Sequence, residues 1–263
     1  MAGSFQTKDR YTLEDLLAIM ERLRSPGGCP WDREQTHESI RRNMLEEAYE
    51  AVEAIDEKDP GHLKEELGDV LLQVVFHARM AEEEGLFTLD DVVDGICKKL
   101  VFRHPHVFGT VDARDSGQAL NTWDAQKREE KGQRTAADTL DSVARSLPAL
   151  MRAEKIQDKA RKAGFDWAEM GPALDKAEEE LGELRQAVEQ GANVEEELGD
   201  LLFAAVKVGR FAGLDSEQAL HGTCEKFIRR FRRVEELAGG RPLDSLGLHR
   251  LEELWQQAKQ DEA

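Results

Sequence analysis

Cysteine, proline, aromatic residues and long apolar runs are all scarce in this chain. Its three cysteines in 263 residues, odd in number and widely spaced, exclude a disulfide-built fold and favour reduced thiols. Prolines number only seven, and abundant Ala, Glu, Leu and Arg predict helices. No apolar stretch approaches the roughly 20 residues of a membrane span, and the first residues contain no signal-peptide core. We therefore expect a cytoplasmic protein with no membrane partner.

Positive charge is also in deficit. The chain carries 36 Lys and Arg against 54 Asp and Glu, which gives a formal net charge of -18. A duplex-binding protein needs a basic face, so we expect no nucleic-acid partner. A small anionic ligand stays possible where cations gather locally. With 40% hydrophobic and 34% charged residues, the chain can form a packed core beneath an ionic surface.

The pentapeptide EELGD occurs twice, at Glu65–Asp69 and 131 residues later (196 − 65) at Glu196–Asp200. Other paired segments keep the same order in both halves: LEEAYE with EEELGE, CKKLVFR with CEKFIRR, and WDAQK with WQQAK. A repeat of domain size predicts two similar domains rather than a solenoid. We expect an all-α fold with a first domain at 1–132, a polar linker at 133–147 and a second domain at 148–263.

Apolar residues at helical spacing predict a helical hairpin in each copy. In the first copy, helices are expected over 36–56 and 62–83, separated by the breaker Lys58-Asp59-Pro60-Gly61. In the second copy they are expected over 171–188 and 194–211. A two-helix hairpin cannot bury both of its faces, so we expect a homodimer in which two protomers complete each bundle.

Each hairpin carries two pairs of carboxylates whose members are three residues apart, and such residues share a helix face. Positions relative to the turn place the two pairs at similar heights on facing helices. Converging carboxylates need raised pKa values or a neutralising cation, and oxygen-only ligands suit Mg²⁺ or Mn²⁺. The pairs are Glu47/Glu50 with Glu66/Asp69, and Glu180/Glu183 with Glu197/Asp200.

A glycine lies within each second pair, in the middle of a predicted helix. Gly68 and Gly199 each cost about 1 kcal/mol relative to alanine. A residue without a Cβ lets another backbone or a ligand come close. Because the cost is carried in both copies, we favour a functional site over a solvated acidic face.

Two alternative functions remain open at this point. A di-iron carboxylate bundle needs Glu-x-x-His on two helices, and neither copy has this motif. A non-catalytic helical binding module would carry its acids as a solvated surface. Absence of stabilisation by Mg²⁺ or nucleotide would favour the binding module, because a ligand of the folded state raises stability.

Cations and a tryptophan follow the second hairpin. The segment KFIRRFRR (226–233) repeats Lys and Arg at steps of three and four residues, which could hold phosphates or pair with nearby Glu. Trp255, like Trp123 in the first copy, could stack on a nucleobase or belong to the core.

The carboxylates, the cationic segment and the late Trp together resemble the MazG family of the all-α NTP pyrophosphatase superfamily. The family pattern EExxE, a spacer and ExxD is matched in both copies. GGCPWDREQTHESI, FRHPHVFG, SLPALMRAEKIQDKA and GFDW are also similar, so the likeness covers nearly the whole chain. The resemblance implies Mg²⁺-dependent hydrolysis of nucleoside triphosphates, ATP among them, to nucleoside monophosphate and pyrophosphate. It also implies a housecleaning role in the nucleotide pool.

The resemblance also assigns roles to individual residues, and it favours the second copy as the active one. Metal ligands fall on Glu180, Glu183, Glu197 and Asp200, and either Glu179 or Glu180 would orient or deprotonate the attacking water. Relatives can carry Lys at the turn position that is Asn193 here, so a contact there is in doubt. Substrate contacts fall on Lys176, Glu179, Asn193, Glu196, Lys226, Arg230 and Trp255. The first copy keeps Glu47, Glu50, Glu66 and Asp69 for metal, and Lys99, Arg103 and Trp123 for substrate, as a second site whose activity the sequence leaves open.

Overall fold

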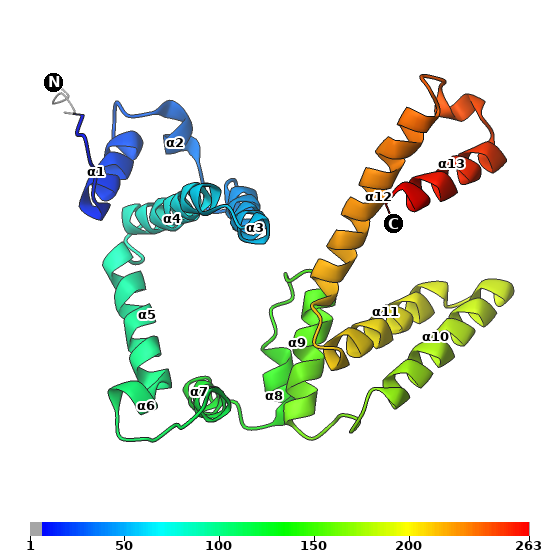
Figure 1. Ribbon diagram of the computed structural model, residues 1–263. Helices are drawn as coiled ribbons and strands as arrows, with labels where there is room; N and C mark the ends of the chain where they lie inside the picture. Colours follow the sequence, from blue (N-terminus) through cyan, green and yellow to red (C-terminus); the bar gives the residue numbers. More distant parts are fainter. Residues whose placement is uncertain (1–6, 263) are drawn as a thin grey trace. The chain divides into compact units, whose positions relative to one another are not determined.

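The computed structural model describes residues 7–262, and every regular element among them is a helix (Figure 1). The predicted all-α fold is therefore confirmed. The chain divides into two compact units, the first ending at Lys127 and the second beginning at Arg128. None of the described helices combines the length and the apolar character that crossing a membrane requires.

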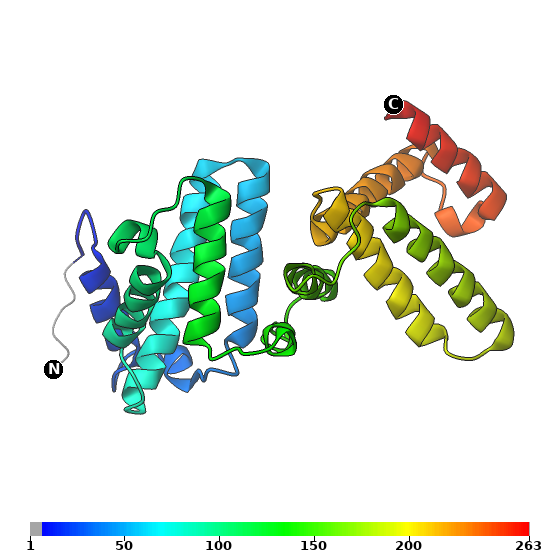
Figure 2. The same ribbon diagram turned by 90° about the horizontal axis from the view of Figure 1, so that it is seen from below.

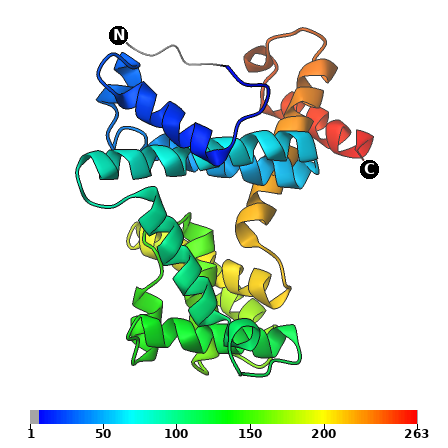
Figure 3. The same ribbon diagram turned by 90° about the vertical axis from the view of Figure 1, so that its left-hand side faces the viewer.

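The first unit is built around one helical hairpin. Helices α3 and α4 form the hairpin, and α1 packs against α4 (Figure 3). The core of this unit is made by buried apolar side chains from α1, from α4 and from the residue before α3. They are Met20, Val75, Phe76, Met80 and Ile40. The helices are α1 (Leu13–Arg24), α2 (Pro30–Glu34), α3 (Arg41–Glu57), α4 (Pro60–Glu83), α5 (Leu89–Arg103), α6 (Pro105–Phe108) and α7 (Ser116–Glu130), which runs across the unit boundary.

The sequence explains where the hairpin turns. Lys58 ends α3 in the left-handed conformation (φ 57°), and Asp59 caps α4 by accepting hydrogen bonds from the backbone N–H groups of Gly61 and His62. The prediction that α3 starts at residue 36 was wrong by five residues. The hydroxyl of Ser39 accepts a hydrogen bond from the backbone N–H of Thr36, and the hydroxyl of Thr36 accepts one from the backbone N–H of Ser39. Residues 37–40 therefore form a turn before the helix.

The second unit contains two hairpins (Figure 2). Helices α10 and α11 pack against each other, α12 packs against α13, and α9 contacts both α11 and α12. Short helix α8 lies within the segment predicted as a linker and packs against α9; the predicted domain boundaries stay a prediction. The elements are α8 (Ala136–Asp141), α9 (Ala149–Lys162), α10 (Gly171–Gln190), α11 (Val194–Phe211), α12 (Ser216–Leu237), the 3-10 turn η1 (Leu243–Ser245) and α13 (Leu248–Asp261).

The second unit's first hairpin has a buried side and an exposed apolar side. Gly191 ends α10 in the left-handed conformation (φ 67°), which reverses the chain within three residues before α11. Alanines such as Ala173, Ala187 and Ala204 are buried between the helices. Large apolar side chains remain exposed on both helices: Leu174, Leu181, Val188, Leu198 and Leu202. An uncovered apolar face of this kind is what the dimer prediction requires.

Candidate functional site

Carboxylates from α10 and α11 converge in the second unit. Glu180 and Glu183 from α10 and Glu197 from α11 offer oxygens that all lie within 4.8 Å of one another. Glu180 is only 7% exposed, which is unusual for a glutamate. Asp200 lies outside this closest group but lines the same cavity as Glu180. Three of the four predicted ligands are thus gathered, with the fourth nearby.

The first unit repeats the arrangement with a different composition. Glu47, Glu66 and Asp69 form its group within 4.8 Å, and Glu50 lies outside it. At the position of Lys176 in the second copy, the first copy has Asn43. At the position of Asn193, it has His62. The side chain that pairs with the buried glutamate therefore comes from α10 in the second unit (Lys176 with Glu180) and from α4 in the first unit (His62 with Glu66).

Lys176 balances part of the charge in the second unit. Its Nζ lies 2.7 Å from an oxygen of Glu179 and 2.8 Å from an oxygen of Glu180. Hydrogen bonds to these two carboxylates raise the pKa of Lys176, so it stays protonated. On the other side, the hydrogen bond with Glu180 and then burial raise the pKa of Glu183. One ammonium does not neutralise the three carboxylates of the group.

The carboxylates of the first unit also repel one another. Burial, followed by the charges of Asp69 and Glu50, raises the pKa of Glu47. Glu66 Oε1 lies 3.1 Å from His62 Nε2, whereas its Oε2 is buried and makes no hydrogen bond within the described chain. Buried carboxylate oxygens without a donor fit a divalent cation, and the all-oxygen groups suit Mg²⁺ or Mn²⁺.

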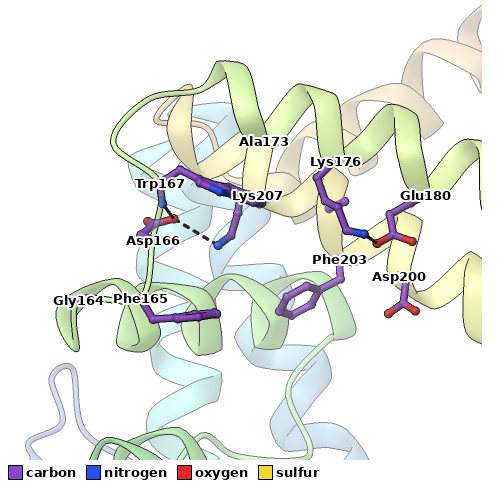
Figure 4. Close-up of a pocket in the computed structure, with 11 residues that line it drawn as sticks. Gly164, Phe165, Asp166, Trp167, Ala173, Lys176, Glu180, Asp200, Phe203 and Lys207 are labelled. Atoms are coloured by element: carbon purple, nitrogen blue, oxygen red, sulfur yellow. Dashed lines mark hydrogen bonds and ion pairs between the residues drawn. The ribbon is translucent and has the colours of Figure 1, made fainter.

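A cavity of about 390 Å³ opens beside the carboxylates of the second unit (Figure 4). Lys176, Glu180 and Asp200 line one end of it. Three aromatic residues also line the cavity: Phe165 and Trp167 from the loop before α10, and Phe203 from α11, which lies close to Lys176 in Figure 4. Charged groups therefore lie at both ends of the cavity, because Asp166 and Lys207 line it beside the Trp167 ring.

An ion cluster fixes the loop that carries two of these rings. The Asp166 side chain is 8% exposed, and its Oδ1 lies 3.2 Å from Lys207 Nζ while Oδ2 pairs with Arg210. Burial alone would raise the pKa of Asp166, but hydrogen bonds and charges from Lys207 and Arg210 hold it below the ordinary value. The Lys207 ammonium also lies 5.0 Å from the centre of the Trp167 ring.

Other predicted substrate contacts lie apart from the cavity within this chain. None of the described residues that line the cavity comes from α12 or α13, the helices that hold Lys226, Arg230 and Trp255. Arg230 pairs with Glu262 at 2.6 Å, and Trp255 packs against Phe227 with ring centres 5.0 Å apart. The α12–α13 pair extends away from the α10–α11 pair (Figures 1 and 2).

The remaining predicted residues take these positions. Asn193 begins α11 in the left-handed conformation (φ 58°), and Glu196 is exposed in the first turn of the same helix. In the first unit, the Arg103 guanidinium lies 5.1 Å and the Lys127 ammonium 4.6 Å from the Trp123 ring centre. Lys99 is exposed one turn before Arg103 on α5.

Neither mid-helix glycine is explained by a contact within the chain. A Cβ added at Gly68 or at Gly199 would meet no atom within 4 Å. The predicted close approach of another backbone or a ligand stays a prediction.

Comparison with known proteins identifies the family. The model of the MazG nucleotide pyrophosphohydrolase domain matches residues 35–108 and again 173–234. The chain belongs to the MazG family. Both matches contain a complete carboxylate hairpin, so the predicted tandem repeat of two MazG domains is confirmed.

Two relatives align with this chain over nearly the full length, and a third aligns over part of it. A nucleoside triphosphate pyrophosphohydrolase of Escherichia coli K12 is 49% identical over 257 residues, which cover 95% of this chain and 98% of the relative. The Thermotoga maritima nucleoside triphosphate pyrophosphohydrolase/pyrophosphatase MazG is 46% identical over 248 residues, or 94% and 95% of the two chains. A Mycobacterium tuberculosis nucleoside triphosphate pyrophosphohydrolase is 44% identical over 155 residues, or 58% of this chain and 46% of the relative.

Some cavity residues of this MazG chain were not singled out from the sequence. GFDW was noted as a family motif, but Phe165, Asp166 and Trp167 were given no role. Phe203 and Lys207 look like ordinary positions of a helix. Only a three-dimensional pairing between the loop and α11 shows that they line one cavity.

Proposed function

We propose that this chain hydrolyses nucleoside triphosphates to nucleoside monophosphate and pyrophosphate in a Mg²⁺-dependent reaction. The observation that carries the proposal is the group of Glu180, Glu183 and Glu197 beside Lys176 and an open cavity. Relatives named for this activity align over almost the whole chain. A non-catalytic binding module has no such support.

The second unit is proposed as the active copy. Glu180, Glu183, Glu197 and Asp200 would hold Mg²⁺, with Mn²⁺ as a substitute. The bound cation would neutralise triphosphate oxygens and the negative charge that develops during phosphoryl transfer. Glu47, Glu50, Glu66 and Asp69 would hold a cation in the first unit in the same way.

The protein's own groups would position the reactants. A water oxygen attacks the α-phosphorus and forms a new P–O bond. The bond from the α-phosphorus to the α,β-bridging oxygen breaks, and pyrophosphate leaves with that oxygen. Glu179 or Glu180 takes the water proton, and Lys176, which touches both carboxylates, donates to phosphate oxygens as charge builds on them.

A homodimer is proposed to complete the site. The exposed apolar face of α10 and α11 needs a cover, and Lys226, Arg230 and Trp255 lie away from the cavity of their own chain. In a symmetric dimer, a second copy could present its α12 and α13 to this cavity. We further propose that the enzyme acts in the cytoplasm and clears unwanted triphosphates from the nucleotide pool.

Product analysis tests the reaction. The purified protein is incubated with each common nucleoside triphosphate and Mg²⁺, and nucleotides, pyrophosphate and orthophosphate are quantified. Nucleoside monophosphate with one equivalent of pyrophosphate is the expected result. Nucleoside diphosphate with orthophosphate would refute attack at the α-phosphorus, and absence of turnover with Mg²⁺ and Mn²⁺ would favour the binding module.

A further inference from the structure

Two acidic residues at the end of α13 hold three arginines of α12. Glu262 directly follows α13, and its two carboxylate oxygens lie 3.0 Å from Arg229 Nε and 2.6 Å from Arg230 Nε. Asp261 pairs with Arg233 at 2.7 Å. Acids are unfavourable at the C-terminal end of a helix, because the helix dipole is negative there. The arginines offset this cost, so the ion pairs tie the end of α13 to α12.

Arg230 is held in a way that leaves its forked end open. It donates to Glu262 through Nε, and its two terminal nitrogens donate no hydrogen bond within the described chain. Arg233 differs, because Nε and one terminal nitrogen contact Asp261 while the other terminal nitrogen contacts Glu236. The terminal nitrogens of a guanidinium form the planar fork that binds two phosphate oxygens at once. Arg230 can therefore bind an anion without giving up Glu262.

A second cation lies on the same side of α12. Lys226 comes one turn before Arg230, and residues four apart share a helix face. The Arg230 side chain is 21% exposed, so solvent reaches it. An ammonium beside an open guanidinium fork suits a ligand with several negative oxygens, such as a triphosphate.

The first copy does not present its matching arginine in this way. Arg103 corresponds to Arg230 (230 − 127 = 103), but it is only 7% exposed, and its guanidinium lies 5.1 Å from the Trp123 ring centre. A guanidinium buried against an indole is not available to an anion from solvent. The hold of Glu262 on Arg230 thus accompanies the copy with the more accessible arginine.

We propose that Glu262 is a positioning residue, which grips Arg230 at Nε so that the terminal nitrogens of Arg230 face the oxygens of a triphosphate. Glu262 itself touches no substrate. The hydrogen bond from Arg230, together with the one from Arg229, outweighs burial and holds the pKa of Glu262 below its ordinary value, so the carboxylate is ionised at neutral pH. A side chain fixed in advance lowers the ordering cost of binding. The inference rests on the proposed function, because that function supplies the triphosphate.

The test measures how tightly inorganic tripolyphosphate binds to the full chain in the presence of Mg²⁺, by titration calorimetry. Four variants are compared with wild type: Glu262→Gln, Glu262→Asp, Arg230→Ala and the double variant that combines Glu262→Gln with Arg230→Ala. Glu236→Gln is the matched control. Glu236 pairs with Arg233 on α12, its side chain is 66% exposed, and the change in charge is the same.

The direction of the effect separates positioning from simple charge. Removing a carboxylate near an anion site reduces repulsion, so charge alone would tighten tripolyphosphate binding in Glu262→Gln. We expect binding to weaken about fivefold instead, because Arg230 loses its fixed orientation. Glu262→Asp keeps a carboxylate and should lose less, and Glu236→Gln should stay within twofold of wild type.

A double-mutant comparison shows whether Glu262 acts through Arg230. If it does, the double variant should bind tripolyphosphate within twofold of Arg230→Ala alone. A further loss of about fivefold in the double variant would overturn the proposal. Unchanged or tighter binding in Glu262→Gln would overturn it too, as would a wild-type chain that binds no tripolyphosphate.

Failure of the positioning role and failure of the reaction are separable. If wild type releases pyrophosphate from ATP while Glu262→Gln binds tripolyphosphate normally, the reaction stands and the positioning role falls. If Glu262→Gln weakens tripolyphosphate only when Arg230 is present, while wild type releases no pyrophosphate from any triphosphate, the positioning role stands and the proposed reaction falls.

Discussion

Asp166, in the loop before α10, is bound to Lys207 of α11 through a contact of 3.2 Å in which both side chains are largely buried. Arg210 pairs with the second oxygen of the same carboxylate. Asp166 therefore connects the loop that carries Phe165 and Trp167 to α11, the helix that carries Glu197 and Phe203. Removing the charge would leave two buried cations without their partner.

Stability at neutral pH should depend on this cluster. Asp166→Asn is expected to lower the free energy of unfolding by about 3–5 kcal/mol at pH 7. Because the pKa of Asp166 is lowered in the folded state, its stabilisation is present above the unfolded value of 3.8 and is lost as pH falls through the folded value. The difference from wild type should therefore shrink below about pH 4 in denaturant titrations.

Asp158→Asn provides a matched control on α9. Asp158 pairs with Arg161 and Lys162 on the surface, where its side chain is 38% exposed. Exposed pairs contribute about 1 kcal/mol or less. If Asp158→Asn and Asp166→Asn lowered the free energy of unfolding by similar amounts, the buried cluster would contribute no more than a surface ion pair.

Turnover should depend on the second unit alone. Glu180→Gln removes a buried carboxylate that contacts Lys176, and we expect pyrophosphate release to fall about 100-fold or more, equivalent to roughly 2.7 kcal/mol of transition-state stabilisation. Glu47→Gln in the first unit should change release less than twofold. Initial rates with ATP and Mg²⁺ measure both. Near-normal turnover in Glu180→Gln would contradict its proposed role, and a large loss in Glu47→Gln would show that the first copy contributes.

Stabilisation by Mg²⁺ should grow with pH. The raised pKa values of Glu47 and Glu183 mean that folding favours their protonated forms, so this contribution is present at low pH and is lost as pH rises through the folded values. A divalent cation bound by these carboxylates would replace the lost protons. Melting curves with and without Mg²⁺ should show a larger increase in Tm at pH 7.5 than at pH 4.5. Glu47→Gln combined with Glu183→Gln should flatten this dependence, and an equal Tm increase at both pH values would argue against cation binding by these groups.

Gly199→Ala separates effects within the chain from effects between chains. Within the chain, a methyl group at this position meets no atom within 4 Å, so alanine should favour the helix by up to about 1 kcal/mol. If a second chain packs closely here, the same methyl group should weaken the dimer at least tenfold, measured by sedimentation equilibrium. If Gly199→Ala stabilised the helix and left the dimer affinity unchanged, Gly199 would not lie at a close contact between two chains.

The sequence by itself determined the repeat, the helices and the acid pairs. Helical spacing is a local property, so it predicted α11 at its observed bounds and put Glu180 and Glu183 on one face. The breakers at Lys58–Gly61 and Gln190-Gly191 likewise predicted both hairpin turns. The start of α3 was misplaced because side-chain hydrogen bonds of Thr36 and Ser39 outweigh apolar spacing there.

Only the tertiary structure decided which side chains share a cavity. Asp166 precedes Lys207 by 41 residues in the chain, and it meets Lys207 and Phe203 because α11 returns alongside α10. It also showed that Lys226, Arg230 and Trp255 do not line the cavity beside the carboxylates of the second unit. Contacts between residues far apart in the sequence depend on how the helices pack against one another. Helical spacing within one segment does not specify that packing.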